Sequence, residues 1–422
     1  MARIVLSTFG SFGDLHPYIA IAIELQRRGH ECVVATSEIY RQKICGEGLG
    51  FAQVRPDVGE LLNEPERLEK FWHARTGIRT LLRDYLLAQV EQSFSDLDRA
   101  CVGADLLLTH AVAYAGPVVA AVRKLRWLSV VLQPALFFSR QEPAVLAAAP
   151  WTRHLGRAVF GALMNIGNKQ TRGWAKPVFA LRKRLGISDD SNPVMEGQFS
   201  PFGTLTLFSE AFAQAQSDWP PNSKPTGFVF YDKRGEIPGL DPARGVGLSE
   251  SLQRFLASGE APVLFTLGSS AVMNAGNFYT ASAEAAKQLG LRAVLLAGNE
   301  SVPADRLIHV EAYASYSALM PHVSAVVHQG GIGTSAQTMR AGKPMLVVPF
   351  ANDQPDNAYR LEGMGVARAL PRGRYRASSA AHELRALFNN TKYAQQAEAL
   401  SRRLQTEDGL SAACDRIEAV IC

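Results

Sequence analysis

The sequence predicts an α/β protein made of two doubly wound units, each with a parallel sheet. Short apolar runs rich in β-branched residues alternate with segments of helical periodicity, which is the pattern of strand-helix-strand units. The pattern occurs twice, and a stretch dense in proline and glycine, Trp219 to Pro242, separates the two series. Ligands of such folds lie at the carboxyl ends of the strands, so functional residues are expected in the loops that follow them.

The first unit opens in the order strand, loop, helix, strand. Arg3 to Thr8 and Glu31 to Thr36 are apolar runs that predict buried strands. Between them lie a loop, Phe9 to Asp14, and a helix, Pro17 to Arg28, which ends at Gly29. Further strands of this unit are expected at residues 52–55, 105–109, 127–132 and 204–209.

Two long segments interrupt the first unit. Residues 61–99 have a helical pattern, and residues 134–185 form an irregular insertion; most of their many aromatic side chains are expected in the core. The insertion also carries eight basic residues, for which a solvated face is the plainer interpretation and contact with a membrane surface is the alternative. These residues are Arg153, Arg157, Lys169, Arg172, Lys176, Arg182, Lys183 and Arg184.

The second unit repeats the pattern. A strand, Pro262 to Thr266, is followed by a turn that contains Gly268 and Ser269, a helix near residues 279–289 and a strand at 292–297. The chain ends in a helical stretch from Ala394. We therefore expect a first domain of residues 1–222, a linker of 223–245, a second domain of 246–400, and a C-terminal helix in 401–422 that can pack back on the first domain.

Composition narrows the class of protein. The 422 residues are 47% hydrophobic and 20% charged, as in a globular protein, and the net charge of +5 is spread thinly, which argues against nucleic acid as a partner. The five cysteines lack C-x-x-C spacing and predict thiols in a reducing compartment. The N-terminus lacks a signal-peptide pattern, and the longest apolar run, Leu106 to Val122, is interrupted by polar residues and proline. We expect a cytoplasmic protein.

The chain is organised around the stretch Ser324 to Asn357. It predicts a strand at residues 325–327, a glycine-rich turn, a helix with residues 336–340 in its interior capped by Thr334 or Ser335, a strand at 345–349 and a polar loop. Glycines allow the backbone to approach a bound group closely, and a helix N-terminus attracts anions, so a diphosphate is the expected ligand.

Two functional interpretations fit this turn. The segment from Gly331 to Ala336 matches the G-x-G-x-x-G/A pattern of dinucleotide-binding proteins, with Asp353 near the spacing of a ribose-binding acid, but that pattern is weak by itself. A nucleotide sugar accounts for more residues. It needs a donor for the diphosphate, which His328 can supply, and a pair that bonds sugar hydroxyls, which Asp353 and Gln354 can supply.

The letters H-Q-G-G-I-G-T, ending in D-Q-P-D-N, resemble the donor-binding signature of the family 1 glycosyltransferases, the UDP-glycosyltransferase superfamily. The form is most similar to bacterial members that act on sterols, macrolides, flavonoids and other lipophilic alcohols. The resemblance implies the GT-B fold, in which two Rossmann-like domains face each other across a cleft. The N-terminal domain would bind the acceptor, and the C-terminal domain would bind the nucleotide sugar.

The resemblance also implies roles for individual residues. Diphosphate contact falls on His328 and the turn, sugar contact on Asp353 and Gln354, and further donor contact on Gly268 and Ser269; the turn comprises Gly330, Gly331, Ile332, Gly333 and Thr334. The ribose-binding Glu of plant members would fall at Ala336 or Gln337, so that contact is not carried over. The plant members' base-stacking Trp is also absent, and Tyr313 or Tyr316 is expected in its place.

Sugar transfer to an alcohol needs a base for the hydroxyl proton. Plant members carry G-H-x-x-P in the first loop; aligned on Gly13 and Pro17, their His falls on Asp14, as in bacterial enzymes with G-D-x-x-P. Asp14 can equally be a helix N-cap, and both roles are compatible. His16 is the alternative base, with an ordinary pKa better suited to neutral pH.

The sequence thus predicts an inverting glycosyltransferase that moves a hexose, glucose or rhamnose, from a UDP- or dTDP-linked donor to a hydroxyl of a lipophilic small molecule. The acceptor would be a flavonoid or other phenol, a sterol or a polyketide, contacted by Phe12, Phe137 and Phe138, and no metal or other cofactor is expected. The alternatives are a nucleotide-sugar-binding auxiliary protein, a GT-B epimerase and an NAD-dependent oxidoreductase.

Overall fold

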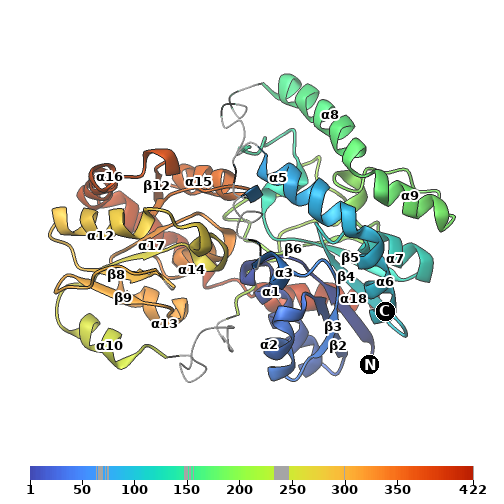
Figure 1. Cartoon of the computed structure of the whole chain (residues 1–422), viewed down its shortest axis with the longest axis horizontal. Coiled ribbons are helices and arrows are strands. Elements are labelled where there is room, and N and C mark those ends of the chain that lie inside the picture. The colour runs from blue at the N-terminus through green and yellow to red at the C-terminus, as the bar shows by residue number, and fades with distance from the viewer. Residues whose placement is uncertain are drawn as a thin grey trace. The chain divides into compact units, whose positions relative to one another are not determined.

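In the computed structural model, the chain divides into two compact units, Met1–Tyr231 with Asp408–Cys422, and Asp232–Glu407 (Figure 1). The structure describes residues 1–422 except 63, 65–69, 72, 74–75, 147–150, 152–153, 155, 232–246, 299 and 422. Most of the predicted linker, together with Trp72, Arg153 and Cys422, therefore lies outside the described residues. We call the two parts unit 1 and unit 2.

Unit 1 contains a sheet of six described strands in the order β3-β2-β1-β4-β5-β6, all parallel. Each strand predicted from the sequence is present, although β3 begins two residues before the predicted segment. The strands are β1 (Arg3–Ser7), β2 (Glu31–Thr36), β3 (Gly50–Gln53), β4 (Leu106–His110), β5 (Arg126–Val131) and β6 (Thr204–Thr206). The interior strands are buried on both faces, which explains their unbroken apolar runs.

Unit 2 repeats this topology with the described order β12-β11-β10-β7-β8-β9, again all parallel. The sequence analysis did not predict β9 and β12, which are short edge strands with polar residues among their side chains. The strands are β7 (Val263–Thr266), β8 (Ala293–Leu296), β9 (Ile308–Glu311), β10 (Ala325–His328), β11 (Met345–Val347) and β12 (Ala367–Ala369).

The helices connect the strands and cover the sheets (Figure 1). Unit 1 contains α1 (Phe12–Arg27), α2 (Arg41–Gly46), α3 (Val58–Leu62), α5 (Gly77–Arg79), α6 (Val90–Ala100), α7 (Gly116–Arg123), α8 (Arg157–Trp174), α9 (Lys176–Arg184) and α18 (Gly409–Ile421), with a π-helical turn at Thr80–Leu86. Unit 2 contains α10 (Glu250–Ala257), α11 (Gly268–Ala271), α12 (Phe278–Gln288), α13 (Tyr316–Leu319), α14 (Ile332–Arg340), α15 (Gln354–Gly363), α16 (Ala377–Asn389) and α17 (Lys392–Leu404). None of the described helices is long and apolar enough to cross a membrane.

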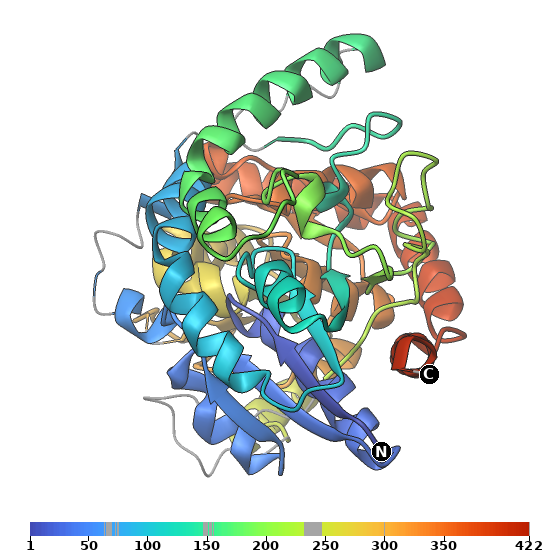
Figure 2. The ribbon, with the colours of Figure 1, turned by 90° about the vertical axis from the view of Figure 1, so that its right-hand side faces the viewer.

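The C-terminal segment differs from the expected single helix. It forms two helices, of which α17 belongs to unit 2 and α18 to unit 1, where α18 packs on α1 and β5. Figures 1 and 2 show α18 beside the blue strands and helices that begin the chain. Arg28, after α1, bonds Asp415 at 2.5 Å and Glu418 at 2.7 Å, and His30 bonds Glu418 at 3.0 Å. These ion pairs join the C-terminus to the first helix.

Candidate active site

The strand order reverses at one point in each sheet, and the predicted site residues follow the strands at those points. In unit 1 the reversal lies between β1 and β4, and in unit 2 between β7 and β10. Doubly wound folds bind ligands at the carboxyl ends of the strands on either side of such a point. The loop before Asp14 follows β1, Gly268 follows β7, and Gly330 follows β10.

Asp14 lies in the first turn of α1. The helix begins at Phe12, five residues earlier than predicted, with Ser11 as its N-cap, so Asp14 is the third helical residue and not the cap. Its Oδ2 accepts a hydrogen bond from the Ser11 backbone N–H at 2.8 Å, and the Ser11 side chain accepts one from the Gly13 N–H at 3.3 Å, which completes a capping box. Gly10 permits this packing, because a Cβ at its φ of +137° would lie 2.2 Å from Asp14 Oδ2.

The second carboxylate oxygen of Asp14 faces His110, the last residue of β4. Asp14 Oδ1 lies 3.9 Å from His110 Nε2, which is longer than a hydrogen bond. Both ring nitrogens of His110 are buried and have no hydrogen-bond partner among the described residues. Burial lowers the pKa of His110, and the Asp14 carboxylate opposes that shift in part. His110 is therefore a neutral imidazole placed behind the carboxylate, edge-on to the Tyr18 ring.

His16, the alternative base, points elsewhere. Residues two apart on a helix do not share a face, and the His16 ring packs against Phe12 and Tyr231 with centroids 5.3 and 5.0 Å away. Phe12 also contacts the Tyr40 ring at 5.2 Å, and the Lys43 ammonium lies 4.7 Å from the centre of the Tyr231 ring. His16 and Phe12 thus belong to a half-buried aromatic cluster.

The two predicted acceptor-binding phenylalanines after β5 have different environments. Phe137 is 5% exposed and stacks between Phe199 and Trp219, with centroids at 5.7 and 4.2 Å, so its structural position is in the core. Phe138 is half-buried and has a left-handed backbone with φ of +51°. A bulky residue held in that conformation is uncommon and is found where surrounding structure or function requires it. Of the two, Phe138 is the better candidate for ligand contact.

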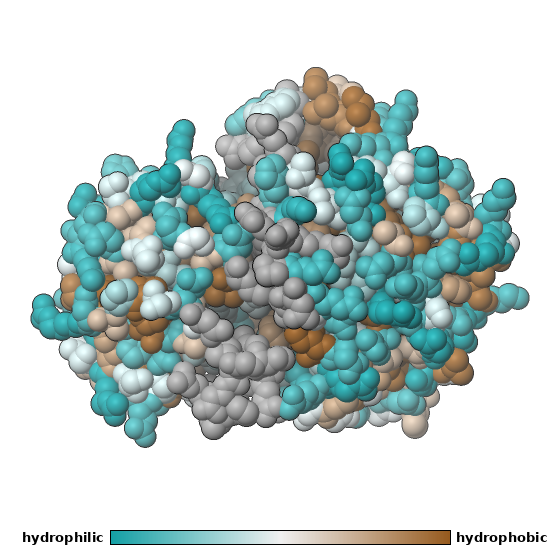
Figure 3. Space-filling model, in the orientation of Figure 1, coloured by the Kyte–Doolittle hydropathy of each residue, from teal (hydrophilic) through white to brown (hydrophobic). Residues whose placement is uncertain are grey.

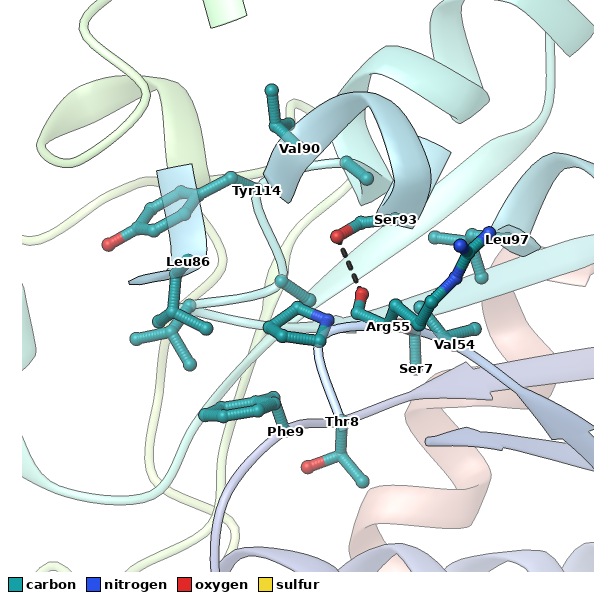
Figure 4. Close-up of a pocket in the computed structure, with 14 residues that line it drawn as sticks. Ser7, Thr8, Phe9, Val54, Arg55, Leu86, Val90, Ser93, Leu97 and Tyr114 are labelled. Carbon is teal, nitrogen blue, oxygen red and sulfur yellow. Dashed lines mark hydrogen bonds between the residues drawn. The ribbon is translucent and has the colours of Figure 1, made fainter. Parts of the chain in front are cut away.

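A small apolar cavity lies at the same edge of the sheet in unit 1 (Figure 4). It is lined by Phe9 and Thr8 after β1, by Leu86 and Val90 from the overlying helices, and by Tyr114 after β4. Its volume is about 30 Å³, which is room for a water molecule and not for a lipophilic alcohol. An acceptor would have to bind outside this cavity or open it.

In unit 2 the glycine turn leads directly into α14. The helix begins at Ile332 with Gly331 as N-cap and no capping side chain, so Thr334 and Ser335 lie inside its first turn and do not cap it, contrary to the prediction. The difference arises because Gly331 itself takes the extended conformation of an N-cap residue. An uncapped N-terminus leaves backbone N–H groups and the positive end of the helix dipole for an anion.

His328 is buried within unit 2. Its Nδ1 accepts a hydrogen bond from the Gly330 N–H at 3.0 Å, and its Nε2 lies 3.3 Å from the Met345 sulfur. The side chain is fully buried, and burial lowers its pKa to about 3, so the ring is neutral. In this geometry His328 holds the glycine turn, and its direct contact with a diphosphate stays a prediction.

Gln329 lies between the two glycine turns that follow β7 and β10. Its amide nitrogen occupies the space that a Cβ would need at Gly268 and at Gly331, 2.6 and 2.8 Å away. Its Oε1 is buried without a hydrogen-bond partner among the described residues. Ser269 lies beside Gly268 in α11. Gln329 was not predicted as a site residue, although its buried amide beside two glycine turns distinguishes it.

The D-Q-P-D-N segment begins α15 and is tied to the glycine turn. Gln354 Oε1 accepts from the backbone N–H groups of Phe350 and Ala351 at 2.8 and 3.0 Å, which fixes the loop before the helix. Asn357 donates to Asp353 Oδ2 at 2.7 Å and to the Gly330 carbonyl at 2.9 Å. Asn357 is therefore a positioning residue that the sequence analysis missed, although its i+4 spacing from Asp353 was a signal for this contact.

The two candidate nucleobase contacts lie after β9. Tyr316 begins α13, and its hydroxyl is 2.8 Å from Thr266 Oγ1 at the end of β7, so it lies at the reversal point of the sheet. Tyr313 is half-buried in the preceding loop. Stacking of either ring on a base stays a prediction. Within the residues that the structure describes, no group of three or more His, Cys, Asp or Glu side chains could hold a metal ion.

The two units are both doubly wound and have the same strand order. At the reversal point, one unit has a carboxylate and the other has an uncapped helix N-terminus suited to a diphosphate. These features define a glycosyltransferase of the GT-B type. Comparisons with known proteins agree. The profile described as "Glycosyltransferase family 28 N-terminal domain" matches residues 4–123, and the one described as "UDP-glucoronosyl and UDP-glucosyl transferase" matches residues 236–409.

The relatives named below cover nearly the whole chain. O-mycaminosyltylonolide 6-deoxyallosyltransferase of Streptomyces fradiae is 32% identical over 99% of this chain and 97% of its own length. Sterol 3-beta-glucosyltransferase of Aspergillus fumigatus is 26% identical over 98% of this chain, which spans only 29% of that longer enzyme. The chain belongs to the UDP-glycosyltransferase superfamily and is a glycosyltransferase.

Solved structures share the fold. A calicheamicin glycosyltransferase superposes with a TM-score of 0.72 at 16% identity, over 100% of this chain and 98% of its own. A spinosyn rhamnosyltransferase complexed with thymidine diphosphate superposes with a TM-score of 0.66 at 18% identity, over 99% of this chain and 100% of its own.

Proposed function

We propose that this enzyme is an inverting glycosyltransferase that moves a hexose from a dTDP- or UDP-sugar to a hydroxyl of a lipophilic alcohol, with Asp14 as the base. The observation that carries the proposal is that the two oxygens of the Asp14 carboxylate have different environments. Oδ2 is fixed by the Ser11 N–H, while Oδ1 faces His110. The Asp14 side chain is 29% exposed. A carboxylate held by one oxygen presents the other in a defined direction.

Asp14 would take the proton from the acceptor hydroxyl as the oxygen attacks the anomeric carbon of the sugar. The bond from that carbon to the diphosphate breaks in the same displacement, which inverts the configuration, and the electron pair leaves with the diphosphate. The N–H groups at the start of α14 would stabilise the charge that develops there. Gly268, Ser269 and Gln329 would border the diphosphate, and Asp353 and Gln354 would bond the sugar hydroxyls.

Polyketide and sterol acceptors have the strongest support, because the relatives named above act on a tylonolide derivative and on sterols. A dTDP-linked deoxyhexose is favoured over UDP-glucose by the deoxyallosyltransferase relative and by the thymidine diphosphate bound to a structural neighbour. Flavonoids and other phenols remain within the proposed acceptor class. We also propose that no metal ion takes part.

The test is a transfer assay with dTDP-rhamnose and UDP-glucose against a panel of macrolide aglycones, sterols and phenols. Expected results are a glycoside whose one-bond C1–H1 coupling constant shows inversion at the anomeric carbon, and a rate unchanged by EDTA. A glycoside of retained configuration, or a rate abolished by EDTA and restored by a divalent metal, would overturn those parts of the proposal. An epimerised donor without acceptor, or donor binding without any product, would identify the epimerase or the auxiliary protein instead.

A further inference from the structure

One surface of unit 1 has no part in the proposed chemistry, the outer face of α8. Phe160 and Gly161 are the buried residues of this eighteen-residue helix, so most of its side chains contact solvent. The outward stripe consists of Val159, Ala162, Ile166, Lys169 and Gly173, all exposed and spaced by three or four residues. We call these five residues the α8 stripe.

The α8 stripe contains two large apolar side chains that are exposed. Val159 is 51% exposed and Ile166 is 63% exposed, one above the other two turns apart. Figures 1 and 2 show α8 at the edge of unit 1, and Figure 3 shows hydrophobic residues gathered over it. Exposed apolar patches of this kind mark contact with another surface.

Charge identifies that surface. Residues 143–188, which contain α8 and α9, include eight basic residues and no acidic one. Lys169 lies in the α8 stripe itself, and Lys176 and Lys183 are exposed on α9 seven residues apart. Among the described residues of this set, three are paired: Arg172 with Asp190, Arg182 with Asp189, and Arg184 with Glu91. The remaining positive charge favours an anionic partner. It disfavours the same face of a second copy of the chain, because the two faces would carry charge of the same sign.

We propose that the α8 stripe and the lysines of α9 dock this enzyme on an anionic lipid bilayer. An interfacial helix buries apolar residues at the headgroup boundary, while lysines beside them reach the lipid phosphates through their flexible side chains. Val159 and Ile166 supply the apolar part, and Lys169, Lys176 and Lys183 supply the charge. This inference goes beyond glycosyl transfer and does not depend on which acceptor is used.

The test is co-sedimentation of the full chain with vesicles of mixed phosphatidylglycerol and phosphatidylcholine, and with vesicles of phosphatidylcholine alone. Wild type is expected to bind the mixed vesicles more tightly. Val159→Ser with Ile166→Ser is expected to weaken binding by about tenfold or more, because buried apolar area is lost. Lys169→Glu with Lys176→Glu is expected to weaken it at least as much, and less so at high salt.

Matched controls separate this effect from general changes. Val102 is 61% exposed outside α8, so Val102→Ser should bind vesicles as wild type does. Arg385→Glu with Lys392→Glu, on exposed positions of α16 and α17, should reduce binding less than the lysine pair of α8 and α9. Thermal unfolding and activity on a water-soluble phenol check the fold of each variant.

Three results would overturn the proposal. The first is that wild type does not bind mixed vesicles at an ionic strength of about 0.15 M. The second is that the α8 variants bind as well as their controls. The third is that the Val159 and Ile166 substitutions change the oligomeric state and leave vesicle binding unchanged, which would make α8 a protein interface.

Discussion

Nε2 of His110 lies 3.9 Å from Oδ1 of Asp14. His110 ends β4, and Asp14 lies in the first turn of α1 after β1, so the pair lies where the sheet of unit 1 reverses order. The imidazole is fully buried and neutral, so it can donate to a carboxylate or accept from a carboxylic acid, depending on its tautomer. If Asp14 is the base, it changes from a carboxylate to a carboxylic acid when it gains a proton during the reaction. His110 can support Asp14 in both states once the two groups close from 3.9 Å to hydrogen-bond distance.

Asp14→Asn is expected to lower kcat by about 10²–10⁴-fold and to leave the KM for the donor nearly unchanged, because the amide cannot take a proton. The amide oxygen can still accept from Ser11, so the helix cap and the melting temperature should be retained. Steady-state kinetics against His16→Asn makes the comparison. Full activity in Asp14→Asn with loss in His16→Asn would move the base to His16.

His110→Phe is expected to lower kcat by less than Asp14→Asn does, because it removes the neighbour of the base and not the base. His110→Gln, which can still form hydrogen bonds, should restore part of that loss. The decisive measurement is a double-mutant cycle, since His110→Phe should have little further effect when Asp14 is already Asn. Additive losses in the double mutant would show that His110 acts independently of Asp14.

Much of the fold followed from the sequence because the interior parallel strands are buried on both faces and appear as unbroken apolar runs. The edge strands β9 and β12 escaped prediction because His309 and Arg368 interrupt that signal. The break between α17 and α18 was not predicted, although Asp408 accepts a hydrogen bond from the Ser411 N–H at 2.9 Å at the start of α18. A C-terminal helix packed on the first domain was expected, whereas the Arg28 ion pairs that hold α18 there join positions far apart in the sequence.

Site residues that stand within a sequence motif were predicted. Site residues that only the fold brings close together were missed. Asp14, His328 and Asp353 stand within recognisable motifs, whereas His110 is a single histidine at the end of an apolar strand, 96 positions from Asp14 along the chain. The predicted doubly wound fold places β1 beside β4, but no motif marks His110 itself as the neighbour of Asp14. Phe137 and Phe138 are adjacent in sequence, and only their environments separate a core residue from a candidate contact.

His328 should make the protein sensitive to acid. Its pKa is lowered from 6.5 to about 3 by burial, so the unfolded chain binds more protons than the folded one between these values. Stability is therefore complete above pH 6.5 and is lost as pH falls, by up to about 1.4 kcal/mol per pH unit from this group. The midpoint of urea unfolding against pH should show a shallower acid slope in His328→Asn. The exposed His382→Asn should keep the wild-type slope; identical slopes in all three proteins would contradict the assignment.

Two neighbouring residues of α15 should respond differently to substitution. Asn357→Ala removes the bonds to Asp353 and Gly330 and is expected to raise the KM for the donor by roughly tenfold, the scale of one or two hydrogen bonds. Asp356→Asn breaks a buried pair with Arg360, 2.8 Å long, and should lower the melting temperature while the KM for the donor changes little. Donor titration and thermal unfolding of both variants give the comparison. A larger KM change in Asp356→Asn would remove Asn357 from the donor site.

Phe137 and Phe138 provide the same contrast on the acceptor side. Phe137→Ala empties a stacked position in the core and is expected to cost about 3–5 kcal/mol of stability. Phe138→Ala should cost less stability, because the ring is half-buried, and should raise the KM for the acceptor while the KM for the donor stays constant. Phe138→Gly provides a second comparison, because glycine adopts a φ of +51° without strain. This variant therefore loses the ring while the backbone conformation is kept. If the KM for the acceptor is unchanged in both Phe138 variants, the left-handed residue after β5 serves the loop alone and the acceptor binds elsewhere in unit 1.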